Sequence, residues 1–176
     1  KTGLSNDNIT YSWIPYTTTT TWPLSPGDET KTVWAKFKNG AGLISVPVTD
    51  TIILDTAPPT VSNIIIQPNI TKSNPTITAT ATDTLTNIVA AEFYGDWTSP
   101  PPAPGFASSM SADDGTFDNL TETVKAIINI GAITEGLHTV WVRARDEAGN
   151  WTSPAPSKTF IIDLTPPAIS GLPWTS

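Results

Sequence analysis

An acidic turn near the middle of the chain holds the residue types that come closest to supporting chemistry. Asp113, Asp114 and Asp118 surround Gly115 in the segment DDGTFDN. Calcium prefers several oxygen ligands on a tight loop, and aspartates around a glycine supply such ligands. The spacing differs from that of an EF-hand loop, and turns rich in Asp and Asn also form without metal, capped by their own side chains. Both interpretations stay open, so calcium is the one cofactor that the sequence admits.

Other polar residues give little support for catalysis. The single histidine, His138, stands at the head of an expected strand, where we expect it to be an exposed edge residue. A catalytic triad also requires a positioned serine and aspartate, and the chain contains no G-x-S-x-G elbow. We therefore expect no enzymatic activity. A second acidic corner, formed by Asp146, Glu147 and Asn150, is a further but poorer place for calcium.

Seven tryptophans raise the alternative of a carbohydrate-binding module. Stacking on sugar rings requires exposed aromatic side chains, for which Trp97 and Trp174 are the candidates. Trp34 and Trp141 each precede a basic residue by two positions, which places ring and cation on the same face of a strand. This arrangement predicts local stacking of the aromatic ring against the cationic side chain.

The composition excludes several classes of protein. Cysteine is absent, so disulfides and thiolate metal sites are excluded. The net charge of −7 and the pI near 4.4 argue against binding to nucleic acid, whose phosphates require a basic surface, and against an anionic membrane surface. Charged residues make up only 14% of the chain and Thr and Ser supply much of the polarity, which we interpret as an extracellular or cell-surface location. The apolar runs are too short to span a membrane.

Four Asn-X-Ser/Thr acceptors in a Thr-rich chain permit N-glycosylation. Several lie in turn-like contexts that tolerate a glycan. The acceptors are Asn8, Asn69, Asn119 and Asn150. The run Thr17–Thr21 favours either an edge strand or O-glycosylation.

One passage of the chain occurs twice. VWAKFKNGAGLISVPVTDTIILDTAPP begins at Val33, and VWVRARDEAGNWTSPAPSKTFIIDLTPP begins at Val140, 107 residues later. Asp55 aligns with Asp163 at a spacing of 108. A full repeat therefore occupies a little over a hundred residues, and the first copy reaches its end by about residue 59.

Alternating apolar residues predict short β-strands along most of the chain. Pro75–Asp83 places Ile77, Ala79 and Ala81 on one face and threonines on the other. Turns rich in Gly, Asn and Pro separate the strands, and double prolines end the sheets of each repeat. In the second copy we expect strands near residues 61–66, 76–82, 90–94, 122–130, 139–145, 152–153 and 159–163. The region 95–118 is too long for a simple loop and predicts an ordered excursion on one edge.

These passages resemble the bacterial and archaeal Ig-like repeats that occur in tandem on cell-surface and secreted proteins. The matching motifs are TVWVRARDEAGNW, FIID and TPP in the second copy, and KTVWAKFKNGAG, DTIILD and TAPP in the first. In LSNDNITYSWIPYTTTTTWPLSPGDETKTV, the order of an SND strand and a following W-L-x-x-G strand also resembles these repeats. The resemblance implies an all-β fold of tandem immunoglobulin-like antiparallel sandwiches. Repeats of this kind serve as stalks, surface-layer units, adhesin arms and spacers, so the resemblance specifies the fold better than the function.

The repeat divides the chain into three parts. Residues 1–57 form an Ig-like domain without its opening strands, and residues 58–165 form a complete domain. Residues 166–176 form a linker and either the first strand of a following element or a donor strand. Its candidate assembly residues are Ala168, Ile169, Leu172 and Trp174.

The incomplete first domain leaves two interpretations open. The chain is a window on a longer repeat array, or strands of another subunit cover the open edge by β-strand addition. The window is favoured, because the tail offers one short strand where two are absent. The leading functional interpretation is a non-catalytic structural segment: a stalk, surface-layer unit or filament subunit whose partners are other repeats or subunits. The alternative is a carbohydrate-binding or spacer module of a secreted enzyme.

Overall fold

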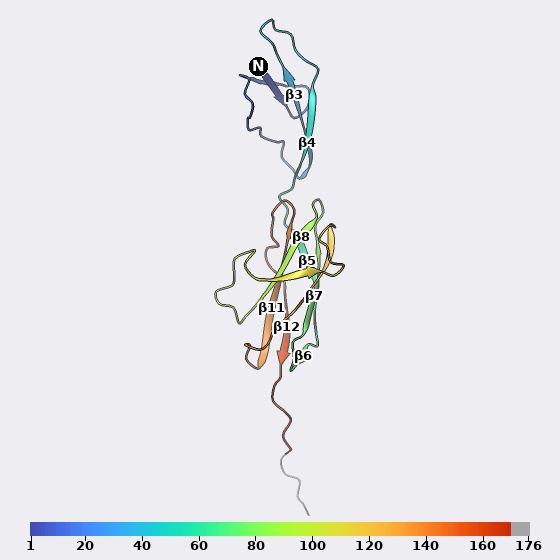
Figure 1. Ribbon diagram of the computed structural model, residues 1–176, viewed down its shortest axis with the longest axis vertical. Coiled ribbons are helices and arrows are strands. Elements are labelled where there is room, and N and C mark those ends of the chain that lie inside the picture. Colours follow the sequence, from blue (N-terminus) through green and yellow to red (C-terminus); the bar gives the residue numbers. More distant parts are fainter. Residues whose placement is uncertain (170–176) are drawn as a thin grey trace, which may run out of the picture. The chain divides into compact units, whose positions relative to one another are not determined.

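The computed structural model describes residues 1–169, which form β-strands, turns and loops and contain no helix (Figure 1). Threonine, valine and isoleucine dominate these strands, as expected for side chains that pack well on a pleated surface. The chain divides into two compact units, the first comprising Lys1–Ala57 and the second beginning at Pro58.

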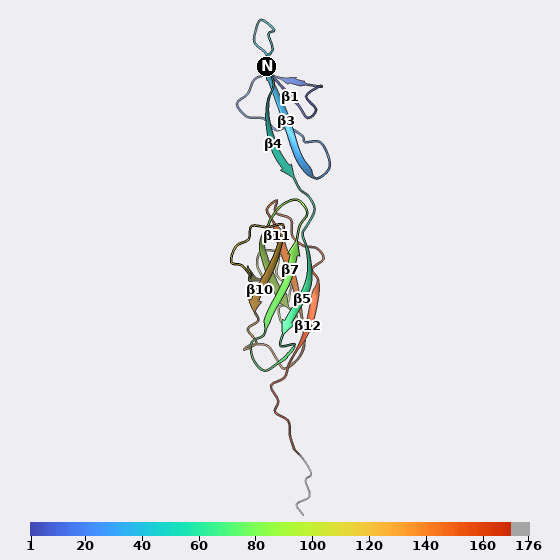
Figure 2. The same cartoon turned by 90° about the vertical axis from the view of Figure 1, so that its right-hand side faces the viewer.

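The first unit is a single antiparallel sheet of four strands. Its strands are β1 (Thr2–Ser5), β2 (Ser12–Ile14), β3 (Glu29–Phe37) and β4 (Val48–Leu54), in the order β2-β1-β3-β4 (Figure 2). β3 therefore lies between β1 and β4 and pairs with both. The outer edge of β4 has no neighbouring strand within this sheet.

Asp7 organises the turn that follows β1. Its Oδ1 accepts hydrogen bonds from the Ser5 hydroxyl at 2.6 Å and from the N–H groups of Ile9 and Thr10, each at 2.8 Å. These donors favour the ionised carboxylate and lower the pKa of Asp7 to about 2. The depressed pKa means that the turn gains stability from Asp7 above its ordinary value of 3.8, and loses it as the pH falls towards 2.

Residues 15–28 connect β2 to β3 without a strand. The expected W-L-x-x-G strand and the edge-strand interpretation of Thr17–Thr21 are therefore wrong. Side-chain bonds fix this connection instead: Trp22 Nε1 donates to Asn6 Oδ1 at 2.7 Å, and buried Lys31 donates to the carbonyl of Pro26 at 3.0 Å. Polar contacts with a loop thus replace the pairing that a strand would provide.

The second unit is a β-sandwich. Its strand order is β5-β7-β10-β9-β8-β11-β12-β6, and short β9 connects the layer containing β5, β7 and β10 to the layer containing β8, β11 and β12 (Figures 1 and 2). The strands are β5 (Thr60–Gln67), β6 (Ile70–Thr71), β7 (Thr76–Thr82), β8 (Ile88–Gly95), β9 (Ser108–Ala112), β10 (Thr121–Ile127), β11 (Gly136–Asp146) and β12 (Ser157–Ile162).

The core of the second unit lies between these two layers. β5 and β7 contact β11, and β5 also contacts β12. The alternation of β7 places Ile77, Ala79 and Ala81 inward, as the sequence predicted, and these three side chains are buried in one cluster with Val140 and Phe160.

Three details of the second unit differ from the strands expected from sequence. Residues 152–153 form no strand, because only Trp151 makes an isolated bridge, to Arg145. The excursion over residues 95–118 is ordered and contains β9, which pairs with β8 and β10. Two-residue β6 was not predicted, because two residues are too few to show an alternating pattern.

The repeated passages form strands with the same register in both units. Thr32 pairs with Thr51 between β3 and β4, and Thr139 pairs with Thr159 between β11 and β12. The spacings are 107 and 108 residues, as in the sequence repeat. The repeat therefore extends from the sequence to the hydrogen-bonded pairing of its strands.

Candidate functional site

A partly uncovered sheet face in the first unit is the most distinctive surface of the described residues. Alternation and register place Phe37 of β3 and Ile52 of β4 on one face, together with Val33, Ala35 and Leu54. The exposed fraction is 43% for Phe37 and 53% for Ile52. We call these five residues the open face.

The same positions are buried in the second unit. Val33 corresponds to Val140, and Ile52 corresponds to Phe160. Val140 is 0% exposed and Phe160 is 2% exposed. The difference follows from the covering layer, because β5 and β7 lie over β11 in the second unit. The first unit contains no strand that corresponds to β5 or β7. The open face also carries Lys31 and Asp50, which pair with Ile52 and Val33. No strand covers it among residues 1–57. Leu4 and Lys31 are nevertheless buried on this face, and Lys31 donates to Pro26 of the connection between β2 and β3.

The acidic turn uses its carboxylates for local contacts. Asp113 forms an ion pair with Lys125 at 2.8 Å, and Asp114 Oδ1 accepts the N–H of Thr116 at 3.1 Å. Asp118 Oδ2 accepts the Thr116 hydroxyl at 3.3 Å. These bonds are those of an Asx-type turn. Calcium binding at this turn stays a prediction.

Two buried aspartates form a closer acidic pair in the second unit. Carboxylate oxygens of Asp83 and Asp146 lie within 4.8 Å of each other. Asp83 Oδ1 accepts the N–H groups of Leu85 and Thr86, and Asp146 accepts the backbone N–H and the side-chain amide of Asn150. Each aspartate therefore closes a turn. Asp146 was predicted as part of an acidic corner, whereas Asp83 was missed because it lies 63 positions away in the sequence.

His138 is buried, and the expectation of an exposed edge residue is wrong. Its Nδ1 lies 2.9 Å from Asp96 Oδ1, and its Nε2 lies 2.8 Å from the carbonyl oxygen of Thr134. Asp96 also accepts the N–H of Thr139 through Oδ2. The imidazole thus holds the start of β11 against the end of β8. Both of its nitrogens are occupied by structural partners.

Aromatic and cationic side chains alternate along the outer face of β11. Tyr94 and Trp141 stack with their centroids 5.5 Å apart, and the guanidinium of Arg143 lies 5.0 Å from the Tyr94 centroid. Arg143 and Arg145 both lie within 6 Å of the Trp151 ring. Trp141 thus stacks on an aromatic ring, whereas Arg143 lies over Tyr94 and Trp151, and Lys36 lies over Tyr11 at 4.1 Å. The predicted stacking of Trp34 and Trp141 on the cation two positions later stays a prediction. Tyr94 and Trp151 join Trp141 from other segments, which sequence spacing did not reveal.

Trp97 packs against its own unit. Its ring makes edge contacts with His138 and Phe160, and it lies over Gly95, where an added Cβ would be 2.3 Å from the indole. Its exposed fraction is 36%, so part of the ring still faces solvent. The other proposed sugar-stacking residue, Trp174, lies outside the described residues, as does Leu172. Sugar binding stays a prediction.

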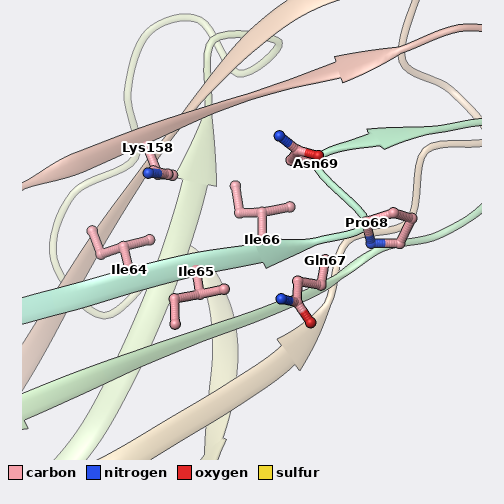
Figure 3. Close-up of a pocket in the computed structure, with 7 residues that line it drawn as sticks. All are labelled: Ile64, Ile65, Ile66, Gln67, Pro68, Asn69 and Lys158. Carbon is pink, nitrogen blue, oxygen red and sulfur yellow. The ribbon is translucent and has the colours of Figure 1, made fainter.

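A groove of about 700 Å³ runs along β5 (Figure 3). Ile64, Ile65 and Ile66 line it, with Asn69 at one end and Lys158 of β12 across from them. Lys158 is the only charged group of this lining. The groove offers apolar contact and backbone edges rather than an acid–base pair.

Glycosylation is expected at three of the four acceptors. Asn8, Asn69 and Asn119 are exposed, whereas Asn150 is partly buried and its Nδ2 donates to Asp146 Oδ2 at 2.9 Å. The Nδ2 of Asn119 also donates to a carboxylate, that of Asp118, but Asn119 is exposed. Because Nδ2 is the atom that receives the glycan, the partly buried Asn150 should stay unmodified in native, glycosylated material. Peptide mass spectrometry after deglycosylation in heavy-oxygen water checks this expectation. Asp146→Asn removes the charged acceptor and serves as the comparison; occupancy of Asn150 in the unaltered chain would contradict the assignment.

Comparison with models of known protein families and with curated proteins returned no match. Among residues 1–169 no helix is long and apolar enough to cross a membrane.

Proposed function

We propose that this chain is a non-catalytic structural segment of an extracellular repeat protein, built from immunoglobulin-like sandwiches. The proposal is supported by the repeated strand register of the two units, which is the pattern of a tandem array. Its partners are further repeats or copies of the same protein. The acidic composition, in which Thr and Ser supply much of the polarity, supports a location at the cell surface.

The pairing of β6 with β12 carries the proposal. β6 follows the first strand of the second unit, β12 is its last strand, and the two run parallel. The N–H of Ile161 donates to the carbonyl of Asn69 at 2.8 Å, and the N–H of Asp163 donates to the carbonyl of Thr71 at 2.9 Å. These bonds join the entering and leaving segments of the unit directly.

Parallel terminal strands resist a pulling force well. Tension applied to the two ends pulls β6 towards its N-terminus and β12 towards its C-terminus, so the strands slide along each other. Because ladder bonds lie across the direction of sliding, they share the load and do not open one after another. The second unit is thereby suited to bear tension in a stalk or filament.

Single-molecule force spectroscopy on the full chain tests this role. The second unit should open in one step that releases about 350 Å, at about 3.5 Å per residue over roughly 100 residues. Ile161→Pro removes one bond to β6 and should lower the unfolding force. Thr159→Pro is the matched control, because strand alternation points its N–H to the same side as that of Ile161 but beyond the β6 pairing. Equal unfolding forces for both variants and the unaltered chain would contradict the mechanical role.

A further inference from the structure

A pocket of about 530 Å³ opens on the second unit where β9 separates from β10. β9 pairs with β10 at Ser111 and Ala112, and its first three residues, Ser108–Met110, pair with β8 instead. The two strands therefore diverge, and residues of β8, β9 and β10 line the space between them together with Trp97. The volume lies within the range of about 300–1,000 Å³ that is typical of ligand sites.

Trp97 gives this pocket a fixed aromatic wall. Its six-membered ring lies over Gly95, where an added Cβ would clash with three atoms of the ring. The rings of His138 and Phe160 lie at centroid distances of 5.8 and 6.2 Å from it. Asp96, the preceding residue, is held in turn, because its Oδ1 lies 2.9 Å from His138 Nδ1. These contacts fix the orientation of the indole, and a wall that is already ordered lowers the entropy cost of binding.

Neutral polar side chains lie beside this wall. Ser108 is exposed and pairs with Phe93, so its side chain lies on the face of β8 that also carries Gly95 and Trp97. Its hydroxyl both donates and accepts hydrogen bonds. Asn129 lines the pocket from β10; its Oδ1 accepts the N–H of Gly131 at 3.1 Å, so its Nδ2 is the donor that faces a ligand.

The backbone of β10 adds a further donor and acceptor. The N–H of Ile128 donates to the carbonyl of Pro75 at 2.9 Å, on the β7 side of the strand. Alternation along the strand therefore points the N–H and C=O of Ile127 to the opposite side, where β9 has diverged. Thr123 has the same orientation four residues earlier, and there its carbonyl accepts the N–H of Asp113 at 2.8 Å. At Ile127 the pocket takes the place of that partner strand.

The charge in the pocket is balanced within the unit. Lys125 is the only charged side chain among the described residues of the lining, and its Nζ lies 2.8 Å from Asp113 Oδ1. The same Nζ donates to the carbonyl of Asp113 at 3.1 Å. The lining thus combines one aromatic ring with neutral hydrogen-bonding groups. A pyranose ring has the complementary chemistry, because its C–H groups form an apolar face for an aromatic ring and its hydroxyls form a polar rim.

We propose that this pocket binds a neutral pyranose unit of a glycan. The C–H face of the sugar packs on the exposed part of Trp97, and its hydroxyls bind Ser108, Asn129 and the backbone of Ile127. This binding site goes beyond the structural role, because a unit that bears tension requires no sugar ligand. It gives the second unit a partner other than a repeat of its own kind.

Titration of the full chain with neutral oligosaccharides tests the site. The probes are cellotetraose, xylotetraose, mannotetraose, chitotetraose and maltotetraose, and the readout is the indole N–H signal of Trp97 in ¹H–¹⁵N spectra. At least one probe should shift this signal to saturation, with a dissociation constant of about 1 mM or below. By calorimetry, Trp97→Ala should weaken binding of that probe at least about tenfold. Trp141→Ala is the matched control, because Trp141 lies on the outer face of β11, outside the lining, and should leave the affinity unchanged.

A second variant blocks the pocket without removing the packing of Trp97. Ser108→Arg places a long side chain beside the indole and should also weaken binding at least about tenfold. Thr123→Arg makes the same change at an exposed position of β10 outside the lining and should leave binding unchanged.

Two outcomes would overturn the proposal: no saturation with any of the five probes at about 10 mM, or binding that Ser108→Arg leaves intact. The second outcome decides even if Trp97→Ala abolishes binding, because Trp97→Ala also removes contacts with His138 and Phe160. Neither outcome affects the mechanical role, which force spectroscopy measures without a ligand.

Discussion

Phe160→Ala should lower the free energy of unfolding of the second unit by about 3–5 kcal/mol. Phe160 is 2% exposed and belongs to the core cluster, where β5 and β7 pack over β11. Removing its ring leaves a cavity that close-packed neighbours fill only in part. Ile52→Ala at the corresponding position of the first unit should cost about 1 kcal/mol or less, since Ile52 is half exposed.

Denaturant unfolding of dilute protein measures both effects, with amide signals of each unit followed separately because two units need not unfold together. Dilution keeps the open face free of other copies. Positions 52 and 160 are equivalent in the repeat. Comparing the two losses therefore shows how much stability a side chain at this position gains from a covering layer. Equal losses at positions 52 and 160 would show that the first unit has a closed core.

Arg143→Leu should destabilise the second unit by about 3–5 kcal/mol, because it leaves the carboxylate of Glu92 buried without its cation. Both residues are nearly fully buried, and Arg143 Nε lies 2.5 Å from Glu92 Oε1. Glu92 also accepts the N–H groups of Gly105 and Ala107. Arg143 Nη2 donates to the carbonyls of Pro102 and Ala103. The pair thereby fixes the excursion between β8 and β9.

Thermal unfolding measures the effect on the stability of the second unit, and hydrogen exchange measures the effect on the excursion between β8 and β9. Arg143→Leu should lower the unfolding temperature and raise the exchange rate of the Gly105 and Ala107 amides. The double variant Glu92→Leu/Arg143→Leu removes both charges and should recover part of the lost stability. Lys125→Ala breaks the exposed pair with Asp113 and should cost about 0–1 kcal/mol. If Arg143→Leu also cost only about 0–1 kcal/mol, the buried pair of Arg143 and Glu92 would not be required for the stability of the second unit.

Sequence alone predicted the regular parts of this fold. Strict alternation in β7 and β11 located the strands and their inward faces, because a period of two is set by local backbone geometry. The repeat also placed the boundary near residue 57, where the two compact units divide. These features depend on neighbouring residues or on comparison of two passages.

The contacts that sequence did not reveal join distant segments. His138 was expected at an exposed edge, but Asp96 and Thr134 bury it by hydrogen bonds that span different parts of the chain. Glu92 and Arg143 lie 51 positions apart and meet because β8 pairs with β11. Pairing of this kind is fixed by the whole sheet. No local pattern in a single sequence indicates which distant residues this pairing brings together.

Native-state hydrogen exchange of the dilute chain tests the central claim most directly, namely that one unit has a closed core and the other an open face. Val140 of β11 and Val33 of β3 occupy equivalent positions in central strands, each paired on both sides. The amides of β3 should exchange at least about a hundredfold faster than those of β11, a difference of about 2.7 kcal/mol in opening free energy. Equal protection of the two strands in a monomeric chain would contradict the claim.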